Sequence, residues 1–582
     1  MEENTLLQMV ISKANKWLTE SYDAQTRAEV ERMLASEDKT ELIECFYKDL
    51  EFGTGGLRGI MGVGSNRINI YTVGAATQGL SNYLKKEFAA LEQIKVVIGY
   101  DSRNNSRLFA DISADIFSAN GIKVYQFEDL RPTPEMSFAI RELGCQSGII
   151  LTASHNPKEY NGYKAYWNDG AQMISPHDTN TIAEVNKIND ASEIKFEGNK
   201  ALIEIIGSDI DNAYIKALQT ITLSPESIAR HHDMKIVYTP IHGTGVHLIP
   251  DTLKAYGFTN IIHVPEQDII SGDFPTVLSP NPEEPAALAL AVQKAIDTDA
   301  ELVLASDPDA DRVGAAIRNN EGEFILVNGN QVALIFVYYL ITRWKELGRI
   351  QGNEYVVKTI VTTELIRTIA ERNGVELFDC YTGFKWIADV MRNNEGKKTF
   401  IGGGEESYGF LCEDFVRDKD AVSACAILAE IAAWAKDNGK TLFQLLQEIY
   451  VEYGFSKEKG ISVVKQGKSG AEEIDAMMKN FRENPLSEIA GSNVTFFYDF
   501  ATLRGLSMAE NEKITLDMPT TANVLQYFTE DGSKISIRPS GTEPKIKFYV
   551  EVQDKVKSVA ELADADKRAE EKINQIKCSL GI

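Results

Sequence analysis

The feature that most constrains the fold is a regular alternation of apolar, β-branched runs with stretches of helical pattern over most of the chain. A strand followed by a helix and a further strand is typical of a parallel βαβ unit. The predicted strands form three rounds: residues 95–100, 122–127 and 147–152, then 235–239, 261–264 and 302–305, then 355–360, 375–378 and 399–401. The pattern therefore predicts three α/β domains with mixed or parallel sheets.

The last part of the chain has a different pattern. Its predicted strands are separated by turns or a single helix, which favours an α+β domain with an antiparallel sheet. These strands are 461–465, 493–498, 523–529 and 546–552, and a closing helix is expected after about residue 559. Because 582 residues exceed what one hydrophobic core usually supports, the length predicts roughly three to five domains. The change in strand pattern divides the chain into four. Their predicted bounds are 1–210, 211–325, 326–455 and 456–582.

The net charge of the chain argues against some classes of binding partner. The formal net charge is −25, from 85 acidic and 60 basic residues. Such a surface repels nucleic-acid backbones and anionic membranes, so neither is expected as a partner. An anionic ligand would need lysines, arginines and backbone N–H groups gathered locally around it.

Membrane and secretory features are not expected either. The longest apolar run, residues 332–341, is too short to cross a bilayer and predicts a buried helix. The start of the chain does not resemble a secretory signal. Six cysteines lack CxxC spacing, which argues against zinc sites and a disulfide framework. We expect a cytoplasmic monomer or small homo-oligomer.

The segment TASHNP, at 152–157, follows a predicted strand directly. Ligands of open α/β sheets bind beyond the carboxyl ends of strands, so Ser154 stands where chemistry is expected. The following His155 offers a proton acceptor beside this hydroxyl. A helix N-cap or a turn explains the same residues, and the Asn-Gly pair at 161–162 also favours a turn.

The segment DPDADR, at 307–312, places three carboxylates two residues apart after another predicted strand. In an extended segment these side chains point the same way. Such a cluster is costly without a cation, and oxygen-only ligands suit Mg²⁺. An EF-hand is excluded, because arginines occupy the positions of its glycine and its bidentate glutamate. The predicted metal ligands are Asp307, Asp309 and Asp311.

The segment GGGEESYG, at 402–409, also follows an apolar strand. Glycines let the backbone approach a ligand closely, and Glu405 and Ser407 could hydrogen-bond sugar hydroxyls. A flexible glycine-rich connector explains the segment equally well.

The segment RPSGTEPK, at 538–545, carries an arginine suited to a bidentate phosphate contact. Ser540 and Thr542 add hydroxyls around a glycine turn. Neither this segment nor GTGGLRG, at 53–59, contains the GK[ST] of a P-loop, so nucleotide binding is not supported.

Together these motifs resemble those of the α-D-phosphohexomutase family in order and in domain placement. The resemblance covers nearly the whole chain, and NGYK at 161–164 and TGFKW at 382–386 extend it. It implies four domains around one cleft, a phosphorylated Ser154, and Mg²⁺ held by Ser154 and the three aspartates. It further implies proton-transfer or electrostatic roles for Arg58, His155 and Lys164. The substrate-binding residues it implies are Arg312, Lys385, Glu405, Ser407, Arg538, Ser540, Gly541 and Thr542.

The implied reaction interconverts sugar 1-phosphates and 6-phosphates through a sugar 1,6-bisphosphate, which also serves as activator. GEES matches the glucose-preferring members, so glucose 1-phosphate and glucose 6-phosphate are expected. Mannose or pentose phosphates, the substrates of phosphomannomutases and phosphopentomutases, are alternatives. Many bacterial relatives carry a histidine where this chain has TGFK, so that histidine's role is not transferred to Lys385.

Two further hypotheses remain open at this point. Residues 309–313, DADRV, fit the DxDx(T/V) pattern of haloacid-dehalogenase-type phosphotransferases, which would make Asp309 the nucleophile. A catalytically silent sugar-phosphate-binding protein would keep the same scaffold. The serine, the aspartates and the phosphate segment are all present, which favours an active enzyme.

Overall fold

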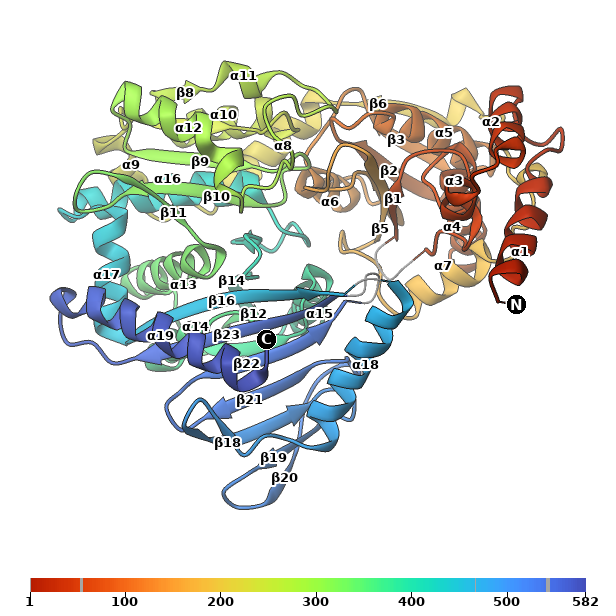
Figure 1. Ribbon diagram of the computed structural model, residues 1–582. Helices are drawn as coiled ribbons and strands as arrows, with labels where there is room; N and C mark the ends of the chain where they lie inside the picture. Colours follow the sequence, from red (N-terminus) through yellow and green to blue (C-terminus); the bar gives the residue numbers. More distant parts are fainter. Residues whose placement is uncertain (1, 53–55, 466, 541–544) are drawn as a thin grey trace. The chain divides into compact units, whose positions relative to one another are not determined.

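The computed structural model describes the whole chain except residues 1, 53–55, 466 and 541–544. It divides into two compact units (Figure 1). The first unit comprises residues 1–328, 391–395 and 407–438, and the second comprises 329–390, 396–406 and 439–582. Each unit is described by itself.

The first sheet of the first unit has six strands in the order β1-β5-β4-β2-β3-β6. Its centre is parallel, while β5 runs antiparallel to β4 and to β1. The strands are β1 (Gly56–Ile60), β2 (Lys95–Tyr100), β3 (Lys123–Phe127), β4 (Ser147–Leu151), β5 (Tyr160–Trp167) and β6 (Ile203–Ile206). The α-helices up to residue 230 are α1 (Glu2–Lys16), α2 (Ala24–Ala35), α3 (Thr40–Phe46), α4 (Ile70–Glu87), α5 (Ser106–Ala119), α6 (Thr133–Glu142), α7 (His177–Val185), α8 (Ser208–Gln219) and α9 (Pro225–Arg230).

The second sheet of this unit has the order β11-β10-β9-β7-β8. Strands β8, β7 and β9 are parallel, and β10 and β11 continue the sheet antiparallel. The strands are β7 (Ile236–Thr239), β8 (Ile261–His263), β9 (Leu302–Ser306), β10 (Val313–Arg318) and β11 (Phe324–Val327). The unit also contains β15 (Phe410–Leu411) and the helices α10 (Gly245–Tyr256), α11 (Pro265–Asp268), α12 (Pro285–Thr298) and α16 (Ala421–Asp437).

The second unit begins with a parallel sheet in which β12 lies between β13 and β14. Its strands are β12 (Glu354–Thr359), β13 (Glu376–Cys380) and β14 (Thr399–Gly404). The α-helices of this part of the chain are α13 (Gly329–Glu346), α14 (Leu365–Arg372), α15 (Phe384–Asn394) and α17 (Leu442–Tyr453).

The fourth sheet is antiparallel at each of its pairings, in the order β16-β23-β22-β21-β18-β19-β20, with β17 beside β18. Its strands are β16 (Phe455–Val464), β17 (Glu488–Ile489), β18 (Ser492–Asp499), β19 (Arg504–Ser507), β20 (Glu512–Thr515), β21 (Leu525–Thr529), β22 (Lys534–Pro539) and β23 (Lys545–Asp554). Helices α18 (Gly467–Glu483) and α19 (Leu562–Leu580) pack against it. The four-domain prediction, with an antiparallel last sheet, is confirmed.

The inner strands are nearly continuous apolar runs because helices cover them. All residues of β4 (SGIIL) and of β9 (LVLAS) are buried, as expected for parallel strands in the middle of an α/β domain. Helices α5 and α6 both pack on β2 and β4. The carboxyl ends of β4 and β9 therefore point their following loops out of a rigid core.

Most predicted strands coincide with observed ones, and the apolar run 332–341 lies within the largely buried α13. Within the described residues, no helix is long and apolar enough to cross a membrane. The turn expected at 161–162 was wrong, because both residues lie inside β5 and pair with β1. A Cβ at Gly162 would lie 2.5 Å from the oxygen of Thr152, so this glycine permits close strand approach. The predicted domain boundaries stay predictions.

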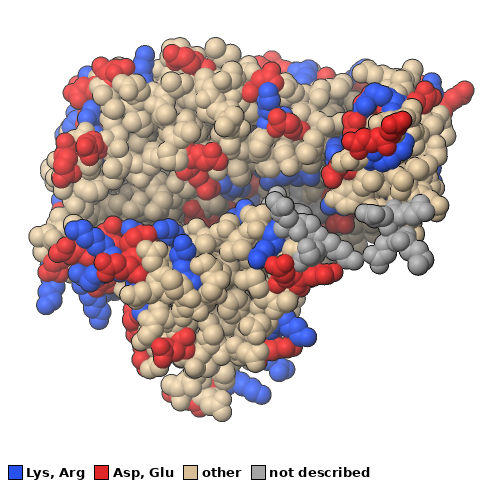
Figure 2. Space-filling model, in the orientation of Figure 1, with Lys and Arg blue, Asp and Glu red and all other residues tan. Residues whose placement is uncertain are grey.

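The charges at the surface are mixed. Figure 2 shows acidic and basic side chains interspersed over the visible face, so the net charge of −25 does not collect there in one patch.

Candidate active site

Ser154 lies in the loop that leaves β4, in a conformation that serines rarely adopt. Its φ is 54°, and its N–H donates to the Thr152 hydroxyl at 2.8 Å. Its hydroxyl oxygen lies 3.0 Å from Asp307 Oδ2 and 3.1 Å from His155 Nδ1. Non-glycine residues keep a left-handed backbone only where their surroundings enforce it, and such strain clusters at functional sites. The loop thus aims one hydroxyl at a carboxylate and an imidazole.

A buried arginine from the neighbouring loop holds this backbone in place. Arg103 Nη2 donates to the carbonyl of Ser154 at 2.6 Å and to that of Asn156. Its Nη1 donates to the carbonyls of Pro157 at 2.8 Å and Tyr160 at 3.0 Å. A planar guanidinium can reach several acceptors in one fixed geometry. Arg103 therefore ties both ends of the serine loop together.

The aspartate segment forms a turn, so the expectation of an extended segment was wrong. Ala310 has a φ of 51°, and its N–H donates to the Asp307 carbonyl at 2.9 Å. Asp307 Oδ1 accepts the N–H groups of Asp311 and Arg312, each at 3.1 Å. Aspartate side chains commonly bond the backbone that follows them and close such turns. The carboxylates converge because the chain folds back, not because strand residues alternate.

The three buried carboxylates of Asp307, Asp309 and Asp311 offer oxygens that all lie within 4.8 Å of one another. Among the described residues, Asp309 Oδ1 and Asp311 Oδ1 find no hydrogen-bond partner. Burial and the two neighbouring carboxylates raise the pKa of Asp307 well above its ordinary value. A hard divalent cation with oxygen ligands fits these clustered carboxylates and their two unpaired oxygens.

Two buried lysines neutralise part of the cluster. Lys164 of β5 places Nζ 2.7 Å from Asp309 Oδ2 and 3.0 Å from Asp311 Oδ2. Lys419 places Nζ 3.0 Å from Asp311 Oδ2 and 3.2 Å from Asp418 Oδ1. Burial alone would raise the pKa of Asp311, but the two ammonium groups hold it far below its ordinary range. Asp311 is therefore a carboxylate at neutral pH.

The other residues predicted in this unit lie around the serine. Burial, reinforced by Arg312 and Arg58, lowers the pKa of His155 well below its ordinary value, so the imidazole is neutral at pH 7. The exposed Arg58 donates from Nη1 to Asn156 Oδ1 at 3.3 Å. Arg312 forms an ion pair of 2.6 Å with Glu283. The first unit thus gathers a hydroxyl, an imidazole, carboxylates and cations.

Further predicted residues lie in the second unit. Glu405 is buried, and its Oε1 accepts the N–H of Gly383 at 2.6 Å, which links it to the TGFKW segment. The Lys385 ammonium lies 5.2 Å from the centroid of the Trp386 ring. The glycines before Glu405 belong to β14, so the flexible-connector interpretation was wrong. Ser407 belongs to the first unit and is half-buried.

Arg538 lies near the end of β22, half-buried and opposite Lys547 of β23. The N–H of Ser540 donates to the carbonyl of Lys545 at 2.7 Å. Gly541 and Thr542, which the sequence also predicts to bind substrate, lie outside the described residues.

Comparison with known proteins decides the family. Four sequence models of the phosphoglucomutase/phosphomannomutase family match in order: alpha/beta/alpha domain I at 49–192, domain II at 212–322, domain III at 328–453 and the C-terminal domain at 467–567. The chain belongs to this family. It is therefore a phosphohexomutase-type isomerase, as the motifs indicated.

Individual relatives agree with this assignment. The chain is 38% identical over 506 residues to a phosphoglucomutase of Staphylococcus haemolyticus, covering 87% of this chain and 90% of the relative. It is 34% identical over 559 residues to the human phosphopentomutase, covering 92% and 90%. Two solved structures share the fold. They are a putative phosphomannomutase of Thermus thermophilus (TM-score 0.66, 22% identity, covering 90% of this chain and 99% of that one) and the phosphoglucomutase parafusin of Paramecium (TM-score 0.67, 18% identity, covering 92% and 96%).

Sequence reasoning about this phosphohexomutase overlooked two residues that the structure brings to the site, Arg103 and Lys419. Arg103 stands in DSR, at 101–103, directly after β2 and at the same sheet edge as Ser154. An acid–arginine pair at a strand end was a usable signal. Lys419, in the segment RDKD at 417–420, had no comparable signal, because its partner Asp311 is far away in the sequence.

Proposed function

We propose that this phosphohexomutase interconverts the 1-phosphate and 6-phosphate of glucose and that Ser154 carries the phosphoryl group between turnovers. The observation that carries the proposal is the placement of the Ser154 hydroxyl, 3.0 Å from Asp307 and 3.1 Å from His155 in a loop held by Arg103. A hydroxyl that faces both a proton acceptor and a carboxylate cluster suits phosphoryl transfer.

In the proposed reaction the phosphoserine faces the free hydroxyl of a sugar phosphate. The bond between phosphorus and Ser154 Oγ breaks with its electrons on Oγ, and a phosphorus–oxygen bond forms to the sugar. The proton of the sugar hydroxyl passes to a side chain of the site, for which His155, Lys164 and Arg58 are the candidates. The sugar 1,6-bisphosphate then presents its other phosphate, which returns to Ser154. The same bisphosphate would serve as activator by phosphorylating the free serine.

Mg²⁺ is the proposed cofactor. Asp307, Asp309 and Asp311 would hold it, with an oxygen of the phosphorylated Ser154 completing the shell. When bound, it would offset the charge that develops on the transferring phosphoryl group. Lys164 and Lys419 hold the acidic cluster together through their ion pairs. Asp309 accepts from Lys164 and Thr133 on Oδ2, which leaves Oδ1 available as a metal ligand.

Substrate recognition is proposed for the residues that the family motifs imply. Glu405 and Ser407 would hydrogen-bond the sugar hydroxyls, and Arg312 and Lys385 would contact the substrate. The phosphate that is not reacting would be held by Arg538, Ser540, Gly541 and Thr542. Glucose is favoured by the GEES motif and by identity to the staphylococcal phosphoglucomutase. Pentose phosphates are the second candidate, because identity to the human phosphopentomutase extends over a similar length. A cytoplasmic location is proposed from the scattered cysteines alone.

The phosphoserine is tested by intact mass after incubation with glucose 1,6-bisphosphate. We expect the mass of one phosphate to be gained by the wild type, to resist hydroxylamine, and to be lost in Ser154→Ala together with turnover. Ser279→Ala is a matched control, since its hydroxyl donates to the carbonyl of His155 at 3.4 Å but is not proposed to carry the phosphoryl group. Near-normal turnover by Ser154→Ala would refute the proposal, and a hydroxylamine-labile phosphate would indicate Asp309 instead.

The preferred sugar is tested by a coupled assay with glucose, mannose, ribose and deoxyribose 1-phosphates at equal concentration. We expect the highest kcat/KM for glucose 1-phosphate. A higher value for ribose or deoxyribose 1-phosphate would overturn the choice of sugar and leave the mutase chemistry in place.

A further inference from the structure

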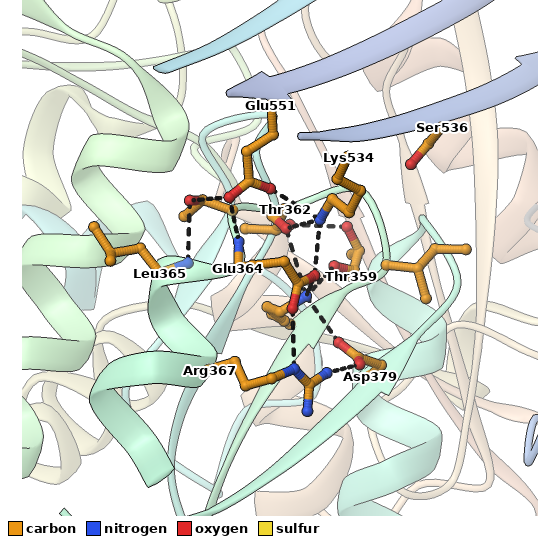
Figure 3. Close-up of polar contacts among 12 residues, drawn as sticks. Thr359, Thr362, Glu364, Leu365, Arg367, Asp379, Lys534, Ser536 and Glu551 are labelled. Atoms are coloured by element: carbon orange, nitrogen blue, oxygen red, sulfur yellow. Dashed lines mark hydrogen bonds and ion pairs between the residues drawn. The ribbon is translucent and has the colours of Figure 1, made fainter. Parts of the chain in front are cut away.

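A buried set of charges joins the third and fourth domains inside the second unit. We call it the interdomain charge network, and Figure 3 shows most of it. Its cations come from β12, α14 and β22, and its carboxylates from β13, β23 and the residue before α14. The members are Lys358, Arg367, Lys534, Glu364, Asp379 and Glu551.

Glu364 stands at the centre of the network. Its Oε1 accepts from Lys358 Nζ and Lys534 Nζ, both at 2.8 Å, and its Oε2 accepts from Arg367 Nε at 2.9 Å. Burial alone would raise the pKa of Glu364, but these cations hold it well below its ordinary value. Two domains thus share one carboxylate. Lys358 of β12 pairs with it from one domain, and Lys534 of β22 pairs with it from the other (Figure 3).

The fourth domain contributes a second link. Lys534 and Glu551 oppose each other across β22 and β23 and pair at 3.1 Å. Glu551 Oε1 also accepts the backbone N–H of Glu364 at 2.8 Å, and Lys534 donates to the Thr362 carbonyl at 2.8 Å. The side chains of Lys358, Lys534 and Glu551 are 0%, 2% and 3% exposed, so water scarcely screens these pairs.

Each end of the network leads to a residue proposed to bind substrate. The hydroxyls of Thr359 and Thr362 donate to Glu406 at 3.1 and 3.3 Å, and Glu406 adjoins Glu405. On β22, Arg538 lies four residues after Lys534, so both side chains stand on the same face of the strand. Ser536, between them on that face, accepts from a Gln526 amide that also reaches the carbonyl of Ile360.

We propose that Glu364, Lys358 and Lys534 are positioning residues that fix strand β22 against the segment carrying Glu405 and Glu406. Arg538 and Glu405 are thereby held in one geometry, suited to a substrate that carries both a phosphate and sugar hydroxyls. Hydrophobic contact alone is non-directional, whereas shared ion pairs of defined geometry fix the register of two elements. This inference rests on the proposed function, because it assumes that Arg538 and Glu405 contact the substrate.

The test separates positioning from stability. Lys534→Met leaves buried carboxylates short of a cation, so it lowers the melting temperature and raises KM. The double variant Lys534→Met/Glu551→Gln removes one charge of each sign, and glutamine retains an oxygen for the backbone N–H. We expect its melting temperature to recover most of the loss, while KM for glucose 1-phosphate stays raised about 10-fold and kcat changes less than about 3-fold. At saturating glucose 1,6-bisphosphate, the extent of Ser154 phosphorylation should match the wild type, because saturation offsets the weaker contact with the distal phosphate.

The matched control is Lys457→Met/Asp566→Asn, which removes a partly exposed pair of 2.8 Å in the same domain and should leave KM unchanged. If the double variant in the network recovers KM together with its melting temperature, the network only stabilises the fold and the proposal is wrong. Arg538→Ala is measured in parallel. If Arg538→Ala leaves KM unchanged, the proposed contact between Arg538 and the phosphate is refuted. The positioning proposal is then refuted as well, because it depends on that contact. If Arg538→Ala raises KM and the double variant does not, only the positioning role is refuted.

Discussion

Replacing Arg103 with lysine tests how the serine loop is held. The guanidinium donates to the carbonyls of Ser154, Asn156, Pro157 and Tyr160, and its side chain is fully buried. Lysine keeps the charge but concentrates its donors on one atom, so at least two of these carbonyls lose their partner. Hydrogen bonds to charged groups are worth about 1.5–3 kcal/mol each, which gives a loss of about 3–6 kcal/mol.

Two measurements test this predicted loss of stabilisation. Urea unfolding should show a lower free energy of unfolding for the first unit, and kcat/KM for glucose 1-phosphate should fall. If about half of the loss is felt in the transition state, kcat/KM falls about 10- to 100-fold. Phosphorylation of Ser154 by glucose 1,6-bisphosphate should slow by a similar factor, because the strained loop is no longer held for transfer.

Arg107→Lys is the matched control. Arg107 also donates to a backbone carbonyl, that of Glu128 at 2.7 Å, but its side chain is half exposed. Its loss should cost less than about 1 kcal/mol and leave turnover unchanged. If Arg103→Lys unfolds like the wild type and keeps kcat/KM within about threefold, the guanidinium does not hold the loop and the reasoning is wrong.

Three further perturbations follow from the geometry. Asp309→Asn should weaken Mg²⁺ binding, measured by calorimetry. Loss of an outer-shell partner alone lowers metal affinity about 10–100-fold, so loss of a direct ligand should cost at least as much. Unchanged affinity would exclude Asp309 as a ligand. Burial and the nearby carboxylate of Glu551 raise the pKa of Glu458 from 4.5 to about 7. The folded state therefore holds the Glu458 proton more tightly than the unfolded state does. The free energy of unfolding should fall by up to about 3 kcal/mol as the pH rises from about 4.5 to about 7. Glu458→Gln should remove that slope in urea unfolding between about pH 5 and 8, and an identical slope would contradict the assignment. Arg538→Ala should raise KM about 10- to 100-fold and increase phosphate release to water per turnover, and neither change would be seen if its loop is only a turn.

The candidate site residues could be predicted because they lie in short contiguous segments of the sequence. Ser154 and His155 are adjacent, and three aspartates lie within five residues of one another, so the proposed nucleophile and the candidate metal ligands could be identified without a fold. Strands such as β4 and β9 were predictable for the same reason, since a buried parallel strand is a continuous apolar run. The predictions failed where local and tertiary signals disagreed. Asn161-Gly162 favours a turn locally, but pairing with β1 keeps both residues in β5.

The sequence by itself determined which groups are available: a hydroxyl, an imidazole, a set of carboxylates and arginines at strand ends. Only the tertiary structure decided which charges meet. Asp311 pairs with Lys164 and Lys419, which come from β5 and from the segment before α16, and Glu364 pairs with a lysine of another domain. The physical reason is that a motif sets the chemistry of its own few residues, whereas the neutralisation of a buried charge depends on which distant strand packs beside it.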